Sequence, residues 1–266
     1  MPTLASSLGD RPVKLMLIGA SGTGKTGALT SLVKAGYTLR VLDFDNGLDA
    51  LAFHVQDECP KRLDQIGYMS FRDRKTMTPM GPVVQGQAKA AVNGVKALDK
   101  WEDESKPSEW GLETVFVLDS LTHFGRAALD WAKGANPSFK DPRLWYAPAQ
   151  QLVMDVLAGL TDPSFRTHVI VITHIDYREL VQGEGEKGYP SSIGGAAGPK
   201  LASFFNTLLL CETSGTGTNL KRVIKTVPTP SIDVKNPAPK LIQREYPIGD
   251  GLASIFKTLR QQPNAA

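Results

Sequence analysis

Short apolar runs alternate with longer amphipathic stretches along this chain. The apolar runs are rich in Val, Ile and Leu, which is typical of strands that are buried on both faces of a parallel sheet. They are Val13–Ile18, Thr38–Phe44, Val115–Ser120, His168–His174 and Thr207–Glu212. Apolar residues recur at helical intervals in Thr26–Ala35, Gln87–Trp101, Leu121–Lys133 and Ala147–Leu160. This order predicts an α/β domain.

The stretches between these elements are less regular. We expect a short strand at Tyr68–Phe71 and loops at Thr76–Gly86 and Arg178–Gly195, the second of them mobile and functional because it holds five glycines and no apolar periodicity. Shorter helices are predicted at Gly47–Phe53, Gly198–Phe205 and Leu252–Leu259, and antiparallel strands around Leu220–Val227. The domain is expected over residues 13–260, between a flexible segment at 1–12 and a flexible tail at 261–266.

A phosphate-binding loop follows the first predicted strand. Residues Gly19–Thr26 fit the pattern G-x-x-x-x-G-K-[ST] at every fixed position, and they lie between a buried strand and a helix, as a P-loop requires. Glycines allow main-chain N–H groups to approach the phosphates closely. Lys25 would reach the β and γ phosphates of ATP, and Thr26 would bind Mg²⁺. The predicted nucleotide-binding residues are Gly19, Ser21, Gly22, Thr23, Gly24, Lys25 and Thr26.

Two acidic positions follow predicted strands. Asp45 comes after the second strand, where a carboxylate beside a P-loop could orient or deprotonate the attacking water. Alternatively, Asp45 and Asn46 cap the next helix. Asp119 ends an apolar strand in the manner of a Walker B acid and would bind Mg²⁺ or a water of its shell. Its alternative role is again a helix cap.

The loop Gly134–Tyr146 combines aromatic and cationic residues. Base stacking and phosphate neutralisation both favour single-stranded nucleic acid as its ligand. The candidate DNA-binding residues are Lys140, Arg143, Trp145 and Tyr146. The alternative is that Trp145 and Tyr146 are buried anchors for the following helix.

His174 stands at the end of a strand that is rich in Val and Ile. At that place in a P-loop sheet a hydrogen-bond donor can sense the γ-phosphate, so His174 is a candidate sensor. A purely structural histidine is the alternative.

Composition narrows the classes of function further. In 266 residues the net charge is +3, but residues 219–266 hold eight Lys or Arg against three acids, so an anionic partner or a merely solvated basic face belongs there. The two cysteines form no metal or disulfide pattern. No apolar run has the ~18 residues of a membrane span, and no signal pattern precedes the domain, so we expect a cytoplasmic protein without a membrane partner.

Together these motifs resemble the ATPase core of RecA-like recombinases, and in particular the compact RecA-like single-strand annealing proteins of bacteriophages. The resemblance runs from about Lys14 to Pro247 and includes the P-loop, the segment Asp43–Asp49 and Asp119-Ser120. It implies a RecA-like P-loop NTPase core with a mostly parallel central sheet, flanking helices and C-terminal antiparallel strands. It also places Asp45 at the water-activating carboxylate and His174 at the sensor.

The resemblance further implies partners. The family reaches a neighbouring subunit's γ-phosphate with cations from a late strand, for which Lys221, Arg222 and Lys225 are candidates and Lys225 is the first choice. The loop Gly134–Tyr146 resembles the family's first DNA-binding loop, and Gly194-Gly195 resemble the two glycines that close its second DNA-binding loop. We therefore expect a ring or filament with ATP at the subunit interface, single-stranded DNA as ligand, a single-stranded DNA-binding protein as a further partner, and the host cytoplasm if the chain is phage-encoded.

The chain departs from the family at two site positions, since Asp45 is shorter than glutamate and His174 replaces glutamine. Slow hydrolysis or binding alone therefore stays open. Two other classes remain as alternatives: a P-loop small-molecule kinase, which would need a lid with arginines, and a non-catalytic nucleotide-dependent assembly protein.

Overall fold

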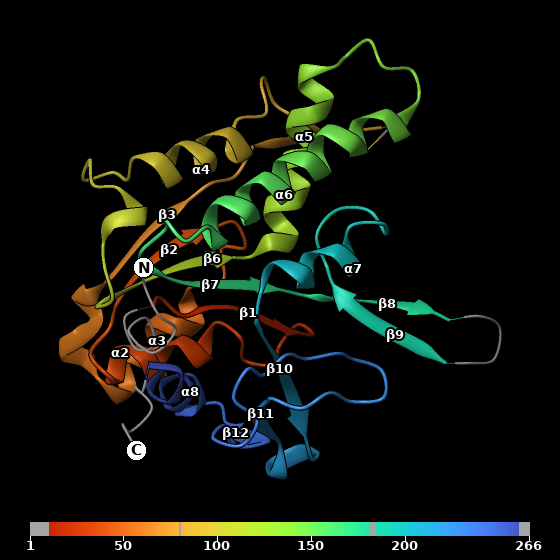
Figure 1. The fold of residues 1–266 in the computed structure, drawn as a ribbon. Helices are drawn as coiled ribbons and strands as arrows, with labels where there is room; N and C mark the ends of the chain where they lie inside the picture. The colour runs from red at the N-terminus through yellow and green to blue at the C-terminus, as the bar shows by residue number, and fades with distance from the viewer. Residues whose placement is uncertain (1–10, 80, 181–184, 261–266) are drawn as a thin grey trace, which may run out of the picture.

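A computed structural model describes residues 11–79, 81–180 and 185–260. Its central feature is an eight-stranded sheet of order β12-β11-β10-β1-β7-β6-β2-β3 (Figure 1). The strands are β1 Lys14–Gly19, β2 Thr38–Asp43, β3 Ile66–Ser70, β6 Thr114–Asp119, β7 His168–Thr173, β10 Thr207–Ser214, β11 Lys221–Lys225 and β12 Glu245–Pro247. The strands β10, β1, β7, β6, β2 and β3 run parallel, whereas β11 and β12 pair antiparallel. The predicted fold class is confirmed.

Alternation along the parallel strands produces two cores. Met16 and Ile18 of β1 face one layer of helices, while Leu15 and Leu17 face the other, because successive side chains of a strand point to opposite faces. Both faces are covered, which is why the strands are apolar almost throughout.

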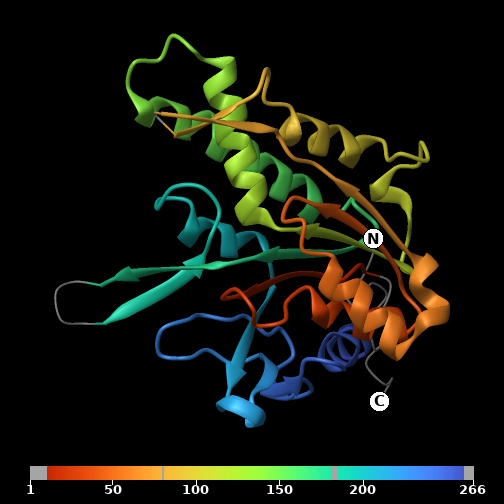
Figure 2. The ribbon, with the colours of Figure 1, turned by 180° about the vertical axis from the view of Figure 1, so that it is seen from behind.

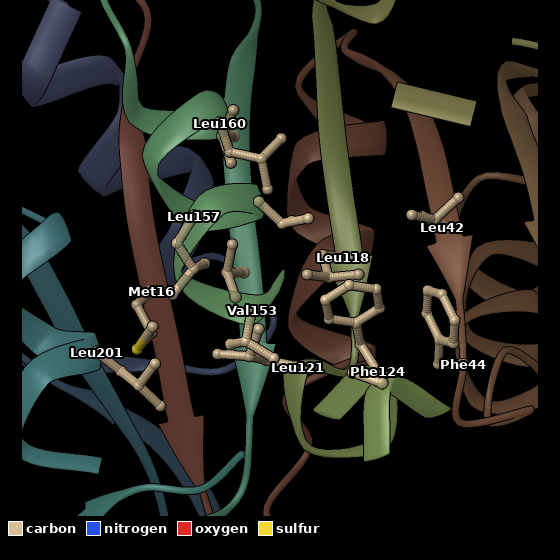
Figure 3. Close-up of a cluster of buried hydrophobic side chains, with 14 of the residues drawn as sticks. Met16, Leu42, Phe44, Leu118, Leu121, Phe124, Val153, Leu157, Leu160 and Leu201 are labelled. Carbon is tan, nitrogen blue, oxygen red and sulfur yellow. The ribbon is translucent and has the colours of Figure 1, made fainter. Parts of the chain in front are cut away.

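The first layer of helices consists of α4 Ala90–Asp99, α5 Leu121–Ala135 and α6 Tyr146–Thr161 (Figure 1). Figure 3 shows Phe124 of α5 and Leu157 of α6 packed over Met16 and Leu118 of the sheet. The second layer consists of α2 Thr30–Lys34, α3 Asp49–Glu58 and α8 Gly251–Arg260, which pack on the opposite face. The last described helix, α8, thus lies on this second side.

Most predicted elements are confirmed with shifted ends. The predicted helix Thr26–Ala35 begins with a 3₁₀ turn, η1 Gly27–Leu29, before α2, and the helix after the second strand starts at Asp49 rather than Gly47. Other short turns are η2 Pro60–Gln65, η3 Pro107–Glu109, η4 Pro142–Trp145 and η6 Gly217–Asn219, and α7 Gly198–Leu201 continues as η5 Ala202–Phe204. The flexible segments expected at 1–12 and 261–266 fall on residues of which 1–10 and 261–266 lie outside the described ranges.

Two predicted loops are wrong in part, because each contains strand residues. Residues 76–78 and 81–84 belong to the paired strands β4 Lys75–Thr78 and β5 Gly81–Val84, and residues 178–179 and 186–190 belong to the paired strands β8 Ile175–Glu179 and β9 Glu186–Pro190. The β8–β9 hairpin projects beyond the sheet in both views (Figures 1 and 2). Apolar alternation arises where one face of a strand is buried. In β4 and β5 both faces are largely exposed, so these strands leave no such signal.

Within the described residues, no helix has both the length and the apolar character that crossing a bilayer requires.

Two glycines of α5 test whether close packing or helix propensity decides the effect of a glycine-to-alanine substitution on stability. A Cβ on Gly125 would lie 3.0 Å from the Ser192 carbonyl carbon and 2.6 Å from its Oγ, whereas a Cβ on Gly134 would meet nothing within 4 Å. We expect Gly125→Ala to lower the free energy of unfolding by about 1–3 kcal/mol through overpacking. Gly134→Ala, the matched control, should be neutral or stabilising by up to about 1 kcal/mol. Urea denaturation measures both. Equal stabilisation by the two substitutions would contradict the close packing.

Candidate functional site

The P-loop leaves the sheet at the end of β1 and requires glycine for two reasons. Gly22 and Gly24 have φ of +79° and +90°, a conformation that side chains with a Cβ rarely adopt. A Cβ on Gly19 would lie 2.6 Å from the carbonyl oxygen of Cys211 in β10. The loop is therefore held close against the neighbouring strand.

Lys25 is folded back over this loop. Its ammonium donates to the carbonyl oxygens of Gly19 and Ala20 at 2.9 and 2.8 Å, and the residue is only 6% exposed. Burial lowers the pKa of Lys25, while the nearby thiol of Cys211 and the carboxylates of Asp119 and Asp45 oppose that effect. The ammonium thus lies among the P-loop carbonyls at the edge of a cavity.

Thr26 and Asp119 form the second half of the site. The Thr26 hydroxyl donates to Asp119 Oδ2 at 2.8 Å, and Asp119 Oδ1 is buried with no hydrogen-bond partner in the described structure. Burial raises the pKa of Asp119 to about 7, against the effect of the Thr26 hydrogen bond. An unpartnered carboxylate oxygen beside a threonine hydroxyl fits Mg²⁺, which prefers hard oxygen ligands.

No cluster of three or more His, Cys, Asp or Glu side chains that could hold a metal occurs in the described ranges. A P-loop magnesium site does not need one, since substrate phosphates and waters complete its coordination.

Asp45 lies between two histidines. Its Oδ1 is 3.1 Å from His123 Nδ1, and its Oδ2 is 3.9 Å from His174 Nε2. The neighbouring Asp43 is 2% exposed and accepts hydrogen bonds from the main-chain N–H groups of Asp45 and Asn46 and from the Ser70 hydroxyl. Asp43 therefore fixes the loop that carries Asp45.

The helix-cap alternatives are wrong for both acids. The N-cap of α3 is Leu48, without a side-chain cap hydrogen bond, so neither Asp45 nor Asn46 serves there. The N-cap of α5 is Ser120, whose side chain accepts from the His123 main-chain N–H, so Asp119 does not cap that helix. Both carboxylates are left available to the cavity.

Most of the residues predicted to form the nucleotide site line one cavity of about 340 Å³. Its lining includes Lys25, Thr26, Asp45, Asp119 and His174, together with Ser21, Gly22 and Gly24 of the P-loop. Sequence reasoning missed several other lining residues, among them His54 and Glu58 of α3 and Ile248. It also missed His123, although its place on the first turn of the helix that follows the Walker B strand could have indicated a residue near the site.

The late cations of β11 separate into two environments. Arg222 lines the cavity of its own chain, and its Nε donates to the Gly22 carbonyl at 3.1 Å. Lys225 does not line that cavity, and instead forms an ion pair with Glu212 of β10. A role for Lys225 at a neighbour's phosphates stays a prediction.

The candidate DNA-binding loop connects α5 to α6. Trp145 is half-buried against the first core and its Nε1 donates to the Asn136 carbonyl at 3.0 Å, which favours the anchor alternative for this residue. Lys140 is exposed, Arg143 is exposed and ion-paired with Asp141 at 2.7 Å, and Tyr146 is 38% exposed. Tyr146 also lies against Gly194, so the two predicted DNA-binding loops are neighbours.

The profile of the AAA domain family matches residues 11–238, which is most of the chain. The chain belongs to the AAA-domain family. Within this family assignment, a P-loop facing a Walker B carboxylate indicates nucleoside triphosphate chemistry. No curated protein matches this AAA-domain chain.

Three solved structures are similar to this AAA-domain protein at low scores. The RadB recombinase is 16% identical over 80% of this chain and 79% of that chain, with a TM-score of 0.45. The flagellar accessory protein FlaH from Methanocaldococcus jannaschii is 11% identical over 91% and 89%, with a TM-score of 0.45. A KaiC-like protein from Pyrococcus horikoshii OT3 is 11% identical over 80% and 78%, with a TM-score of 0.41.

The position of Arg222 over its own P-loop predicts an effect on nucleotide binding within one chain. We expect Arg222→Ala to weaken ATP binding by about tenfold or more, because a charge-assisted contact to phosphate contributes about 1.5–3 kcal/mol. Lys240→Ala, at an exposed cation outside the cavity, is the control and should leave the Kd unchanged. Titration calorimetry measures both, and equal affinities for the Arg222→Ala variant and the unmodified protein would contradict the prediction.

Proposed function

We propose that this protein is a magnesium-dependent ATPase of the RecA type that acts on single-stranded DNA in recombination or strand annealing. The observation that carries the proposal is the convergence of Lys25, Thr26, Asp119 and Asp45 on one cavity. A phosphate-binding ammonium, a metal-binding pair and a carboxylate that can act as a base are the groups that hydrolysis of a triphosphate needs. The phage-type setting in the host cytoplasm is part of the same proposal and rests on the sequence resemblance.

The residues of the chain divide the chemistry among them. Lys25 and the main-chain N–H groups of the P-loop bind the phosphates and hold them in position. Thr26 and Asp119 would hold Mg²⁺, which would neutralise the negative charge that develops on the phosphate oxygens. Asp45 lies at the cavity as the base that orients or deprotonates water, and His174 offers a hydrogen-bond donor beside it.

Contact with single-stranded DNA is proposed at the loop between α5 and α6. Lys140 and Arg143 are exposed cations, and Tyr146 presents part of its ring to solvent beside Gly194. Cations that contact phosphates and an aromatic ring that stacks on bases are the usual means of binding single strands.

Assembly into a ring or filament with ATP between subunits is proposed together with this activity. Lys225 lies on β11 outside the cavity of its own chain, where it pairs with Glu212, and the sequence resemblance is what supports a role at a neighbour's nucleotide. Such a cation would add stabilisation of the transition state and couple hydrolysis to assembly.

The kinase alternative has less support. It needs a mobile lid with arginines above the phosphates, and Arg178 is the arginine of the predicted loop at residues 178–195. That side chain lies 3.5 Å from Asp176 and over the ring of Tyr189, and it is not among the residues that line the cavity. Turnover of ATP without a small-molecule acceptor would separate the two functions.

Nucleotide chemistry is tested by a pair of cavity variants. We expect Mg²⁺-dependent release of phosphate by the unmodified protein and loss of ATP binding in Lys25→Ala. Asp45→Asn should still bind ATP but hydrolyse it at a rate reduced at least about 100-fold. A phosphate-release assay and calorimetric titration give both quantities. Unchanged ATP affinity in Lys25→Ala would refute the site.

DNA binding is tested by its dependence on salt. We expect the double variant Lys140→Ala/Arg143→Ala to lower the slope of log K against log salt by about 1.4, since each phosphate contact on a single strand contributes about 0.7. Fluorescence anisotropy of a labelled oligonucleotide measures this slope. Lys96→Ala on α4 is the control because it removes an exposed cation elsewhere. Identical slopes for both variants would exclude this loop as the DNA contact.

A further inference from the structure

The carboxylate of Asp45 needs a support that its own loop does not give. Asp43 binds the main-chain N–H groups of this loop, but the side chain of Asp45 extends from it to the mouth of the cavity. A carboxylate with free rotation about its side-chain bonds loses much of its value as a base, because a displacement of about 1 Å can cost about 100-fold in rate. The groups that contact Asp45 therefore decide how well it works.

His123 is the side chain that contacts Asp45 most closely. Its Nδ1 lies 3.1 Å from Asp45 Oδ1, whereas His174 Nε2 lies 3.9 Å from Oδ2, beyond hydrogen-bond distance. One carboxylate oxygen thus lies in contact with an imidazole nitrogen, and the other does not.

The position of His123 is itself fixed from two directions. It lies in the first turn of α5, where its main-chain N–H donates to the Ser120 hydroxyl at 3.4 Å, and its Nδ1 is 3.0 Å from that hydroxyl. Its ring meets the ring of His174 edge to face at 5.9 Å. Because α5 starts directly after Asp119, the helix that follows the metal-binding acid also carries the support for the base.

The protonation of His123 suits donation to a carboxylate. Burial lowers its pKa, Asp45 and Asp43 oppose this effect, and Arg126 and Arg72 reinforce it. A neutral ring must place its hydrogen on Nδ1 to donate to Asp45, and the Ser120 hydroxyl, 3.0 Å from the same nitrogen, then accepts from that hydrogen as well. Such a ring orients the carboxylate without protonating it.

We propose that His123 is a positioning residue for hydrolysis, which holds Asp45 Oδ1 through its Nδ1–H so that Oδ2 faces the water that attacks the triphosphate. The inference rests on the proposed ATPase function and assigns a role to a residue outside the P-loop and the Walker B strand. His123 contacts neither phosphate nor metal in this role and acts through Asp45.

Two substitutions of similar polarity distinguish hydrogen-bond donation at the Nδ1 position from the mere presence of a polar side chain at residue 123. In His123→Asn the amide nitrogen can take the place of Nδ1, whereas in His123→Gln it takes the place of Nε2 and leaves Asp45 without its donor. We expect His123→Gln to lower kcat about 10- to 100-fold with an unchanged Kd for ATP, and His123→Asn to retain kcat within a few-fold of the unmodified protein. Thermal unfolding of both variants shows whether they fold equally well.

A double-mutant cycle with Asp45→Asn then tests whether His123 acts through Asp45. Residues that act as a unit are not additive, so the double variant should be no slower than Asp45→Asn alone. The inference is overturned if the losses in kcat are additive in the double variant, or if His123→Gln has the same kcat as the unmodified protein. It is also overturned if both His123 variants lose rate in proportion to a loss of stability. If the unmodified protein hydrolyses ATP and His123→Gln has an unchanged kcat, only the role of His123 is overturned. If no Mg²⁺-dependent hydrolysis occurs at all, the proposed function is overturned as well.

Discussion

The parallel direction of β1, β2, β6 and β7 is the constraint on which the site depends. Strands that run the same way end at the same edge of the sheet, so residues far apart in sequence meet there. Gly19, Asp43, Asp119 and Thr173 are the last residues of these strands. The pairing of Asp43 with Asp119 and of Asp119 with Ile172 places the ends in register. Asp119 itself, and Ser21, Asp45 and His174 one or two positions after the other strands, then line one cavity.

That edge can carry polar groups only because both faces of the sheet are sealed. The strands contribute alternately to two cores, which bury nearly all of their apolar side chains. Burial of Asp119 is the unfavourable part of this arrangement, since the residue is 1% exposed and, in the described structure, its carboxylate accepts a single hydrogen bond, from Thr26. An unpartnered buried carboxylate oxygen is unfavourable, and a cation is the partner that removes the penalty.

The α5 helix connects several parts of the molecule. Its first turn carries Ser120 and His123 beside the catalytic candidates, its middle packs through Gly125 against Ser192, and its end leads into the candidate DNA-binding loop. Gln150 of α6 donates to the Ile193 carbonyl at 3.1 Å, so the same layer of helices also contacts the segment after β9. The nucleotide cavity and the proposed DNA surface therefore share one rigid element.

The sequence by itself determined the P-loop, the order of strands and helices and the class of chemistry, which is that of nucleoside triphosphates. These features rest on local signals, namely glycine spacing, apolar runs and acids at the ends of strands. The candidates that it singled out, Lys25, Thr26, Asp45, Asp119 and His174, all line one cavity in the structure, and their roles stay predictions. Tertiary structure alone decided that Asp43 holds a loop, that Arg222 covers its own P-loop while Lys225 pairs with Glu212, and that His123 meets Asp45. It also decided the two hairpins. Such contacts join residues from separate elements whose meeting depends on strand order and helix packing, and no local pattern in the chain encodes that.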